Sequence, residues 1–451
     1  MLQGEPRLCP PRDTCVTKTL LVCLAATTCG CGATQLIPTP NVFVGSAENP
    51  FADVPEAFQS NKVDVLYVTD RRSIPDECGE EDKEKIHYDW GRSLSLAFGS
   101  AVVDFGEDIP WVTLVAASRT DDRSVSLPVV VSEISEKGRF PETPMPLVRN
   151  EAGGFSPDPQ ALSRHTNVLE QFHRELNQRL ALTPKKEVYV YIHGYNNSFD
   201  DAVKVMAELW HFLGRQGIPI AYTWPAGVGG LRGYFYDRES GEFTIYHLKQ
   251  LLRALIDCDG LERVHLIAHS RGTDVLVTAL RELFIERRQK ILDRTGPARI
   301  GNIVLAAPDL DLEVISQRIV AEGFMRYPER LTIYMSKTDV ALGLSTWLFL
   351  SQRRMGRVQF ADLPPSLQKG AEHAPHLSLV DVRVSSGFIG HSYFYSHPAV
   401  LSDLILLLRD NRPPGKEHGR PLEKLGVASW RMRNDYPEAS EEDPSETDED
   451  E

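Results

Sequence analysis

The body of this chain contains few cysteines. Of seven cysteines in 451 residues, five lie within the first 31 residues, and only Cys78 and Cys258 lie beyond them. Two distant cysteines cannot form a disulfide framework, and this part of the chain has no CxxC pair that would suggest a zinc site. We therefore expect both thiols to be small buried side chains and expect no metal.

The chain also lacks an excess of basic residues. The formal net charge is −14, and residues 434–451 hold 10 acidic residues with neither lysine nor arginine, which leaves −4 for the rest. Binding of nucleic acid needs a dense cationic face, so nucleic acid is not expected as a partner. With 42% hydrophobic and 25% charged residues, the composition is that of a globular protein.

The N-terminal apolar run, residues 19–28, is too short to cross a bilayer, which needs about 20 residues. Its length suits a secretory signal: it follows Lys18 and ends near Cys29 and Cys31. Such a cysteine resembles the lipidated residue of bacterial lipoproteins. The pattern predicts a signal in residues 1–31 and a lipid-anchored protein on the periplasmic side of the bacterial cell envelope, with no other membrane contact. A cytoplasmic protein with a disordered N-terminus is the alternative.

Composition divides the remaining chain into three parts. Residues 32–61 contain four prolines and little periodicity, which indicates a linker. Residues 62–410 have regular apolar patterns and are expected to form one folded domain. Residues 411–451 are rich in Pro, Gly and charged side chains, which is typical of a disordered acidic tail.

Short apolar strands alternate with amphipathic helices through much of the folded part. Strands are expected at residues 63–68, 95–105, 111–117, 188–192, 218–224, 264–268, 303–307, 331–335 and 377–384, and helices at 166–182, 200–213, 244–256, 273–287 and 399–409. Strands that are apolar throughout and separated by helices indicate a parallel sheet buried on both faces. The sequence therefore predicts an α/β protein with a mostly parallel central sheet and helices on both faces.

The strongest motif is Ala-His-Ser-Arg-Gly at residues 268–272, between an apolar strand and a helix. It fits the nucleophile elbow G-x-S-x-G, with alanine in the first small position. The turn is sharp, so the residues two before and two after the serine, Ala268 and Gly272, must be small. Ser270 is the predicted nucleophile, and the alternative is a serine that caps the helix.

A second motif, His-Gly-Tyr-Asn-Asn at residues 193–197, directly follows a strand. In an α/β hydrolase, this loop supplies one backbone amide of the oxyanion hole, and the residue after the nucleophile supplies the other. These amides belong to Tyr195 and Arg271. Gly194 lets the backbone approach the substrate, and His193 supports the loop. The alternative is a polar turn without a catalytic role.

The acid and the base of a triad should follow the serine in the order Ser, Asp, His. Asp339 lies in the loop after the strand at 331–335, where this order places the acid. Asp309 and Asp311, after the preceding strand, are alternatives. His391 lies between the last strand and the last helix and is the expected base, with Gly390 giving the loop room to bend.

Several short stretches together resemble a bacterial α/β-hydrolase family of unknown function over roughly residues 63–408. They are Val-Leu-Tyr-Val-Thr-Asp-Arg at 65–71, residues 193–197, Trp-Pro at 224–225, Tyr-Asp-Arg at 236–238, residues 268–272, Ala-Pro-Asp at 307–309 and Gly-His-Ser at 390–392. The resemblance implies an α/β-hydrolase fold and a hydrolytic site, and it leaves the substrate open. Arg271 stands where many relatives in the wider superfamily have Met or Gln, which places a cation near the site and favours anionic substrates.

These residues predict a serine hydrolase. Ser270 would attack a carboxylic ester or related acyl bond of a small molecule or lipid, with His391 as base, Asp339 as orienting acid and an acyl-enzyme intermediate. Such chemistry needs no cofactor. The alternative is a non-catalytic binding or scaffold protein of the cell envelope that keeps the hydrolase fold.

Overall fold

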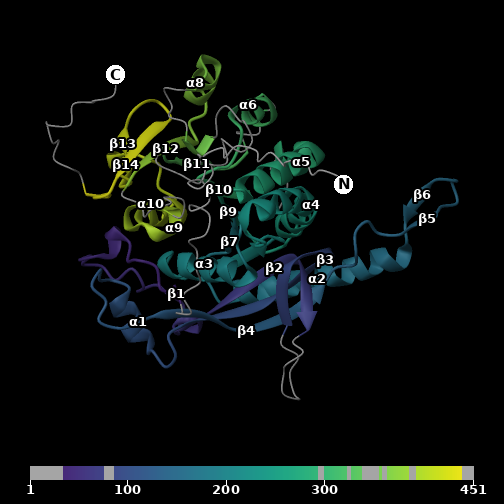
Figure 1. Cartoon of the computed structure of the whole chain (residues 1–451), viewed down its shortest axis with the longest axis horizontal. Coiled ribbons are helices and arrows are strands. Elements are labelled where there is room, and N and C mark those ends of the chain that lie inside the picture. Colours follow the sequence, from purple (N-terminus) through teal and green to yellow (C-terminus); the bar gives the residue numbers. More distant parts are fainter. Residues whose placement is uncertain are drawn as a thin grey trace, which may run out of the picture. The chain divides into compact units, whose positions relative to one another are not determined.

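The structure is a computed structural model that describes residues 34–75, 86–292, 299–321, 323, 327–337, 355–357, 363–384 and 393–438. These residues fold around a 12-stranded sheet in the order β1-β4-β3-β2-β8-β7-β9-β10-β11-β12-β14-β13 (Figure 1). The predicted α/β fold with a mostly parallel central sheet is confirmed.

The centre of the sheet is parallel, and antiparallel strands extend it at both edges. The parallel strands are β2 (Lys62–Pro75), β8 (Ile218–Thr223), β7 (Glu187–Ile192), β9 (Arg263–His269), β10 (Arg299–Ala306), β11 (Arg330–Met335), β12 (Leu377–Arg383) and β14 (Ser429–Arg433). The antiparallel partners are β1 (Thr34–Gln35), β3 (Ile86–Phe105), β4 (Pro128–Arg139) and β13 (Glu423–Lys424). The carboxyl ends of β7, β9 and β10 therefore meet at one edge of the sheet.

Side chains of the central strands alternate between two apolar layers. In β7, Val188, Val190 and Ile192 pack on one face, whereas Tyr189 and Tyr191 pack on the other. The first face is covered by α2 (Pro159–Ala181), α4 (Gly230–Ile256), α5 (Gly272–Leu292), α6 (Leu312–Ile315) and α8 (Pro365–Glu372). The second is covered by α3 (Phe199–Phe212), α9 (Tyr393–Ser396) and α10 (Pro398–Leu408). Figure 1 shows α4 and α5 side by side, to the right of β9 and β10 in this view. Burial on both faces explains why the strands are apolar throughout.

The helix after β7 begins at a capping box. The Ser198 hydroxyl accepts the amide of Asp201, and the Asp201 carboxylate accepts the amide of Ser198. These bonds satisfy amides that a helix start leaves free, which fixes the start of α3. The loop at residues 193–197 is thus held between a buried strand and a capped helix.

The expected linker at residues 32–61 is wrong for its described residues, which pack on the domain. Phe43 and Phe51 are buried and contact each other edge to face. The amide of Ile37 donates to the carboxylate of Glu208 on α3 at 3.0 Å. The regular elements in this segment are short, and the aromatic side chains between its prolines are nevertheless buried.

The expected disordered tail is also wrong for residues 411–438. Residues of β14 pair with β12, and the side chain of Arg420 is fully buried beside Asp403 on α10. Tyr436 donates its hydroxyl to the same carboxylate at 2.7 Å. A buried ion pair therefore helps to hold residues 411–438 on the domain, although their low apolar content had suggested disorder. Residues 439–451 lie outside the described residues.

Residues 111–117 form helix α1 (Trp111–Ala117), although the sequence predicts a strand there. Leu114 and Ala117 are buried, whereas Val112 is 73% exposed, which is the three-residue spacing of a helix. Pro110 precedes the helix and supplies no amide that would need a partner. The β-branched residues alone made this segment look like a strand. A short hairpin, β5 (Leu147–Arg149) with β6 (Phe155–Pro157), lies in the part that the sequence left unassigned.

Candidate active site

Ser270 occupies a sharp turn between β9 and α5. Its φ is 51°, in the left-handed region that non-glycine residues avoid at a cost of about 1–2 kcal/mol. Its amide donates to the carbonyl of Ala306 at 2.9 Å, and its carbonyl accepts the amide and the hydroxyl of Thr273 at 3.1 and 2.6 Å. The strand, turn and helix expected around Ser270 are therefore present. Strain held by its surroundings in this way is characteristic of functional sites.

Two glycines allow the turn to lie against the loop after β7. A Cβ on Gly272 would lie 2.3 Å from the carbonyl oxygen of His193, and one on Gly194 would lie 2.9 Å from the Cβ of Ser270. Ala268 is completely buried at the end of β9. A larger residue at 194 or 272 would therefore collide with the opposing segment. The same contact brings the loop at residues 193–197 beside the serine.

His193 is a buried structural side chain. Its Nδ1 contacts the carbonyl of Gly194 at 2.9 Å, and its Nε2 accepts the amide of Trp224 at 3.1 Å. The ring stacks on the indole of Trp224 with centroids 5.0 Å apart. Burial, together with the charge of Arg71, lowers the pKa of His193 to about 3. Both ring nitrogens are therefore engaged within the two loops that follow β7 and β8.

Arg71 also belongs to this site, although no role was predicted for it. It follows Asp70 near the middle of β2 and is 1% exposed. Its guanidinium donates to the carbonyls of Asn197 and Ala226, each at 2.8 Å, and contacts Nε2 of His193 at 3.2 Å. Arg71 therefore ties the loop after β7 to the loop after β8. The only signal in the sequence was its position at the end of the stretch 65–71 that carries the family resemblance.

If the chain is the serine hydrolase that the sequence predicts, replacing Arg71 by lysine should lower kcat for an ester by about 10²-fold, since a small displacement of a positioning loop has effects of this size. Lysine keeps the charge but cannot reach several carbonyls from one planar group. The effect should fall on kcat more than on KM, because the loop acts on the transition state. The neighbouring Arg72 is 57% exposed, so Arg72→Lys is the matched control and should keep wild-type kinetics. Equal losses in both variants would contradict a positioning role for Arg71.

Asp237 on α4 holds the same loop through a second bond. Its carboxylate is completely buried and accepts the amide of Asn196 at 2.9 Å. Asn196 has a φ of 55°, so this bond supports a second strained residue. Burial raises the pKa of Asp237 to about 6, against the opposing effects of the amides of Asn196 and Gly227 and the charge of Arg71. Asp237 also belongs to a stretch, 236–238, that carried the resemblance without an assigned role.

The stability difference between Asp237→Asn and the wild type should change with pH. The carboxyl titrates near 4 in an unfolded chain and at about 6 in the folded protein, which therefore binds the proton more tightly. The contribution of Asp237 is fully present below about pH 4 and is lost as the pH rises through about 6. The free energy of unfolding of the variant, minus that of the wild type, should rise over this interval. Urea titrations at several pH values measure this difference. Asp53→Asn, which changes an exposed carboxyl, is the control. A difference that does not vary with pH would contradict a raised pKa for Asp237.

Two aspartates were alternatives for the triad acid, and the structure separates them. Asp311 accepts the amides of Glu313 and Val314 and so caps α6. Asp309 is buried, accepts the hydroxyl of Tyr234 at 2.6 Å, and donates its amide to the carbonyl of Ser270 at 3.4 Å. Of the two, Asp309 is the one beside the elbow.

Arg271 is less available to substrate than the sequence suggested. Its guanidinium pairs with Asp274 at 2.9 Å, and it is 8% exposed. Burial works to lower its pKa, but Asp274 and Asp309 outweigh burial, so the net shift is upward. The cation is therefore balanced by acids on both sides, which weakens the expected preference for anionic substrates.

Four predicted site residues lie outside the described residues: Asp339, His391 and the candidate lipidation sites Cys29 and Cys31. Within the described ranges, no group of three His, Cys, Asp or Glu side chains is placed to hold a metal ion. A helix both apolar and long enough for a membrane crossing is likewise not found in these ranges.

Comparison with protein families matches residues 169–409, just over half of the chain, to an α/β-hydrolase family of unknown function, DUF900. The matched region includes β7 to α10 and therefore Ser270, the loop at residues 193–197, and Asp237. Arg71 lies before it. A search of curated proteins finds no match.

Proposed function

Because this chain belongs to the DUF900 family of α/β hydrolases, we propose that it is a serine hydrolase that cleaves a carboxylic ester or related acyl bond through Ser270. The observation that carries the proposal is the left-handed turn of Ser270 between β9 and α5, packed against Gly194 of the neighbouring loop. A serine that only capped α5 would not need the strained φ.

In the proposed reaction, His391 takes the hydroxyl proton of Ser270 as the serine oxygen attacks the ester carbonyl. The amides of Tyr195 and Arg271 stabilise the negative oxygen, and Asp339 orients the imidazole and stabilises its charged form. His391 then gives its proton to the leaving alcohol. Water hydrolyses the acyl-enzyme with the same base and releases the carboxylic acid.

Support for the oxyanion hole comes from the positions of the two loops. The backbone at Gly194 lies against Ser270, and Arg71 and Asp237 hold the two residues that follow Tyr195, through the carbonyl of Asn197 and the amide of Asn196. Donors that are held before the substrate arrives need no reorganisation during the reaction, which is why such groups contribute strongly to catalysis. A loop held in this way beside a strained serine favours catalysis over the scaffold alternative.

Two asparagine variants identify the acid of the triad. Asp339→Asn should lower kcat for a neutral nitrophenyl ester by about 10⁴-fold, since the imidazole is then held in the wrong tautomer. Asp309→Asn should have a much smaller effect, because its carboxylate is bound to the hydroxyl of Tyr234. The measurement is steady-state hydrolysis with both variants folded by circular dichroism. A reversed order would assign the acid to Asp309, and no hydrolysis by the wild type of any ester tested would favour the scaffold alternative.

A further inference from the structure

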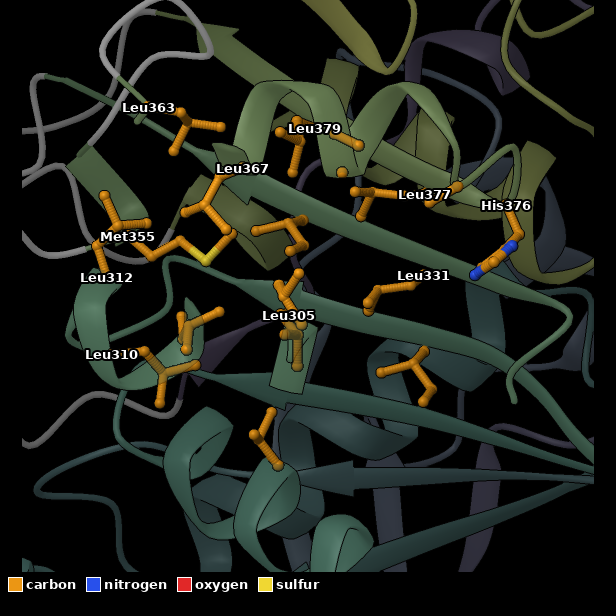
Figure 2. A pocket seen from close by; sticks show the side chains of 18 of the residues that line it. Leu305, Leu310, Leu312, Leu331, Met355, Leu363, Leu367, His376, Leu377 and Leu379 are labelled. Atoms are coloured by element: carbon orange, nitrogen blue, oxygen red, sulfur yellow. The ribbon is translucent and has the colours of Figure 1, made fainter. Parts of the chain in front are cut away.

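An apolar cavity of about 510 Å³ lies between the sheet and the helices α6 and α8. Figure 2 shows Leu310, Leu312 and Met355 at one end and His376 at the opposite end. Among the described lining residues, the polar side chains are Lys369, His373 and His376, and the others are apolar or glycine. The volume falls within the range of about 300–1,000 Å³ that is usual for small-molecule sites.

The wall on the sheet side consists of two rows of branched side chains. Ile303, Leu331 and Leu377 are paired neighbours on β10, β11 and β12, and Leu305, Ile333 and Leu379 form the next row two residues further along. Residues two apart on a strand share a face, so all six side chains point into the same layer. This arrangement gives a wall that extends along the strands and offers no hydrogen-bonding group.

One end of the cavity is next to the elbow of Ser270. Leu310 lines the cavity, and the preceding residue, Asp309, donates its amide to the carbonyl of Ser270. Val277 on α5, two turns after the serine, also lines it. The cavity therefore starts at the carboxyl ends of the strands, where the proposed site lies, and runs toward the amino end of β12 at His376.

The contents of such a cavity should be hydrocarbon. Its walls are almost entirely apolar, so a hydrocarbon chain that replaces water there removes apolar surface from solvent. Water binds such walls poorly, because each molecule needs two to four polar partners. Of the polar side chains, His376 lies at the end opposite Leu310 (Figure 2), and Lys369 and His373 are exposed.

We propose that this cavity binds the hydrocarbon chain of an acyl group whose ester carbon reaches Ser270, so that the substrate is an ester of a medium- or long-chain fatty acid. The inference rests on the proposed function for the position of the ester carbonyl at Ser270. The size and apolar lining of the cavity indicate the kind of acyl group. The chain's own apolar residues 340–350, Val-Ala-Leu-Gly-Leu-Ser-Thr-Trp-Leu-Phe-Leu, are the competing occupant.

Binding and hydrolysis test the pocket separately. A fluorescent long-chain fatty acid, cis-parinaric acid, is titrated into the full-length Ser270→Ala protein, which is proposed to be unable to turn over an ester. Saturable binding that decanoate displaces and acetate does not is the expected result. Absence of saturable binding would overturn the cavity as a site for an acyl chain, whatever the wild type hydrolyses.

A filled pocket should change the preference for chain length. In Ile333→Phe and Leu331→Phe, the larger ring occupies part of the cavity, so the ratio of kcat/KM for nitrophenyl decanoate to that for nitrophenyl acetate should fall about tenfold or more. Leu425→Phe makes the same change at a leucine outside the cavity that is 43% exposed, and should keep the wild-type ratio. Melting temperatures show whether each variant is folded, and fatty-acid binding by the folded variants should weaken in parallel.

An unchanged ratio in both folded pocket variants would contradict the acyl-chain assignment even if the enzyme is active. Failure of the proposed function looks different: the wild type would hydrolyse neither ester, while binding of the fatty acid to Ser270→Ala would still report on the cavity. The two failures are therefore distinguishable.

Discussion

Ser270→Ala should lower kcat for ester hydrolysis by about 10⁴–10⁶, the loss expected when a serine hydrolase loses its nucleophile. The substitution removes only the hydroxyl, so the turn at Ser270 and its backbone bonds to Ala306 and Thr273 should remain. Serine and alanine meet the same steric penalty at a φ of 51°, because both carry a Cβ. The melting temperature should therefore stay close to that of the wild type.

The measurement is steady-state hydrolysis of a nitrophenyl ester by both proteins at equal concentration. Ser132→Ala, on β4, makes the same chemical change at a hydroxyl that donates to the carbonyl of Val102 far along the sheet, and it should keep wild-type activity. If Ser270→Ala retained more than about one hundredth of the wild-type kcat, a value far above the expected loss, Ser270 could not be the nucleophile.

Arg420→Met should reduce the free energy of unfolding by about 3–5 kcal/mol, the usual effect of removing one partner from a buried ion pair. Arg420 and Asp403 have no exposed side-chain area and form two bonds at 2.7 and 2.8 Å. The variant leaves a buried carboxylate with only the hydroxyls of Tyr334 and Tyr436 as described donors. For a domain with a total stability of about 5–15 kcal/mol, this is a large fraction.

Urea denaturation measures this loss, with Arg433→Met as the control. Arg433 pairs with Glu423 at 3.6 Å, and both side chains are more than one third exposed, so its removal should change stability by less than about 1 kcal/mol. Removing both charges in Asp403→Asn with Arg420→Met should recover part of the loss, since no unpaired charge remains. A loss for Arg420→Met no larger than that of the control would mean that residues 411–438 are not packed on the domain.

Much of the fold could be predicted because its central strands are buried on both faces. The strand expected at residues 188–192 is β7 less its first residue, and the one at 264–268 lies within β9. Such segments are apolar at every position, so no register or partner needs to be known to recognise them. The helices between them follow from the same alternation.

The terminal segments could not be predicted from local pattern. The strand β14 reads Ser-Trp-Arg-Met-Arg, and its position in the sheet depends on pairing with β12 some 50 residues earlier. Arg420 looks like a surface residue until Asp403 of α10 is known to face it. The terminal segments are buried mainly by contacts with residues far away in sequence, and such contacts cannot be predicted from composition.

The candidate site divides in the same way. Ser270, Gly272 and Gly194 were predictable because each lies in a short motif beside a strand, where the backbone geometry dictates the residue type. Arg71 and Asp237 act on the loop at residues 193–197 from more than 40 residues away in sequence, through bonds to its carbonyl and amide groups. Such bonds depend on the folded backbone, so no short sequence motif predicts them.

Covalent labelling of the wild-type protein with a fluorophosphonate is the most direct test of Ser270 as an activated nucleophile. Digestion and mass spectrometry should locate one adduct on the peptide that contains Ser270, and Ser270→Ala should remain unlabelled under the same conditions. Labelling of another residue at the same rate, or hydrolysis of esters by a wild-type protein that the probe does not label, would contradict the account.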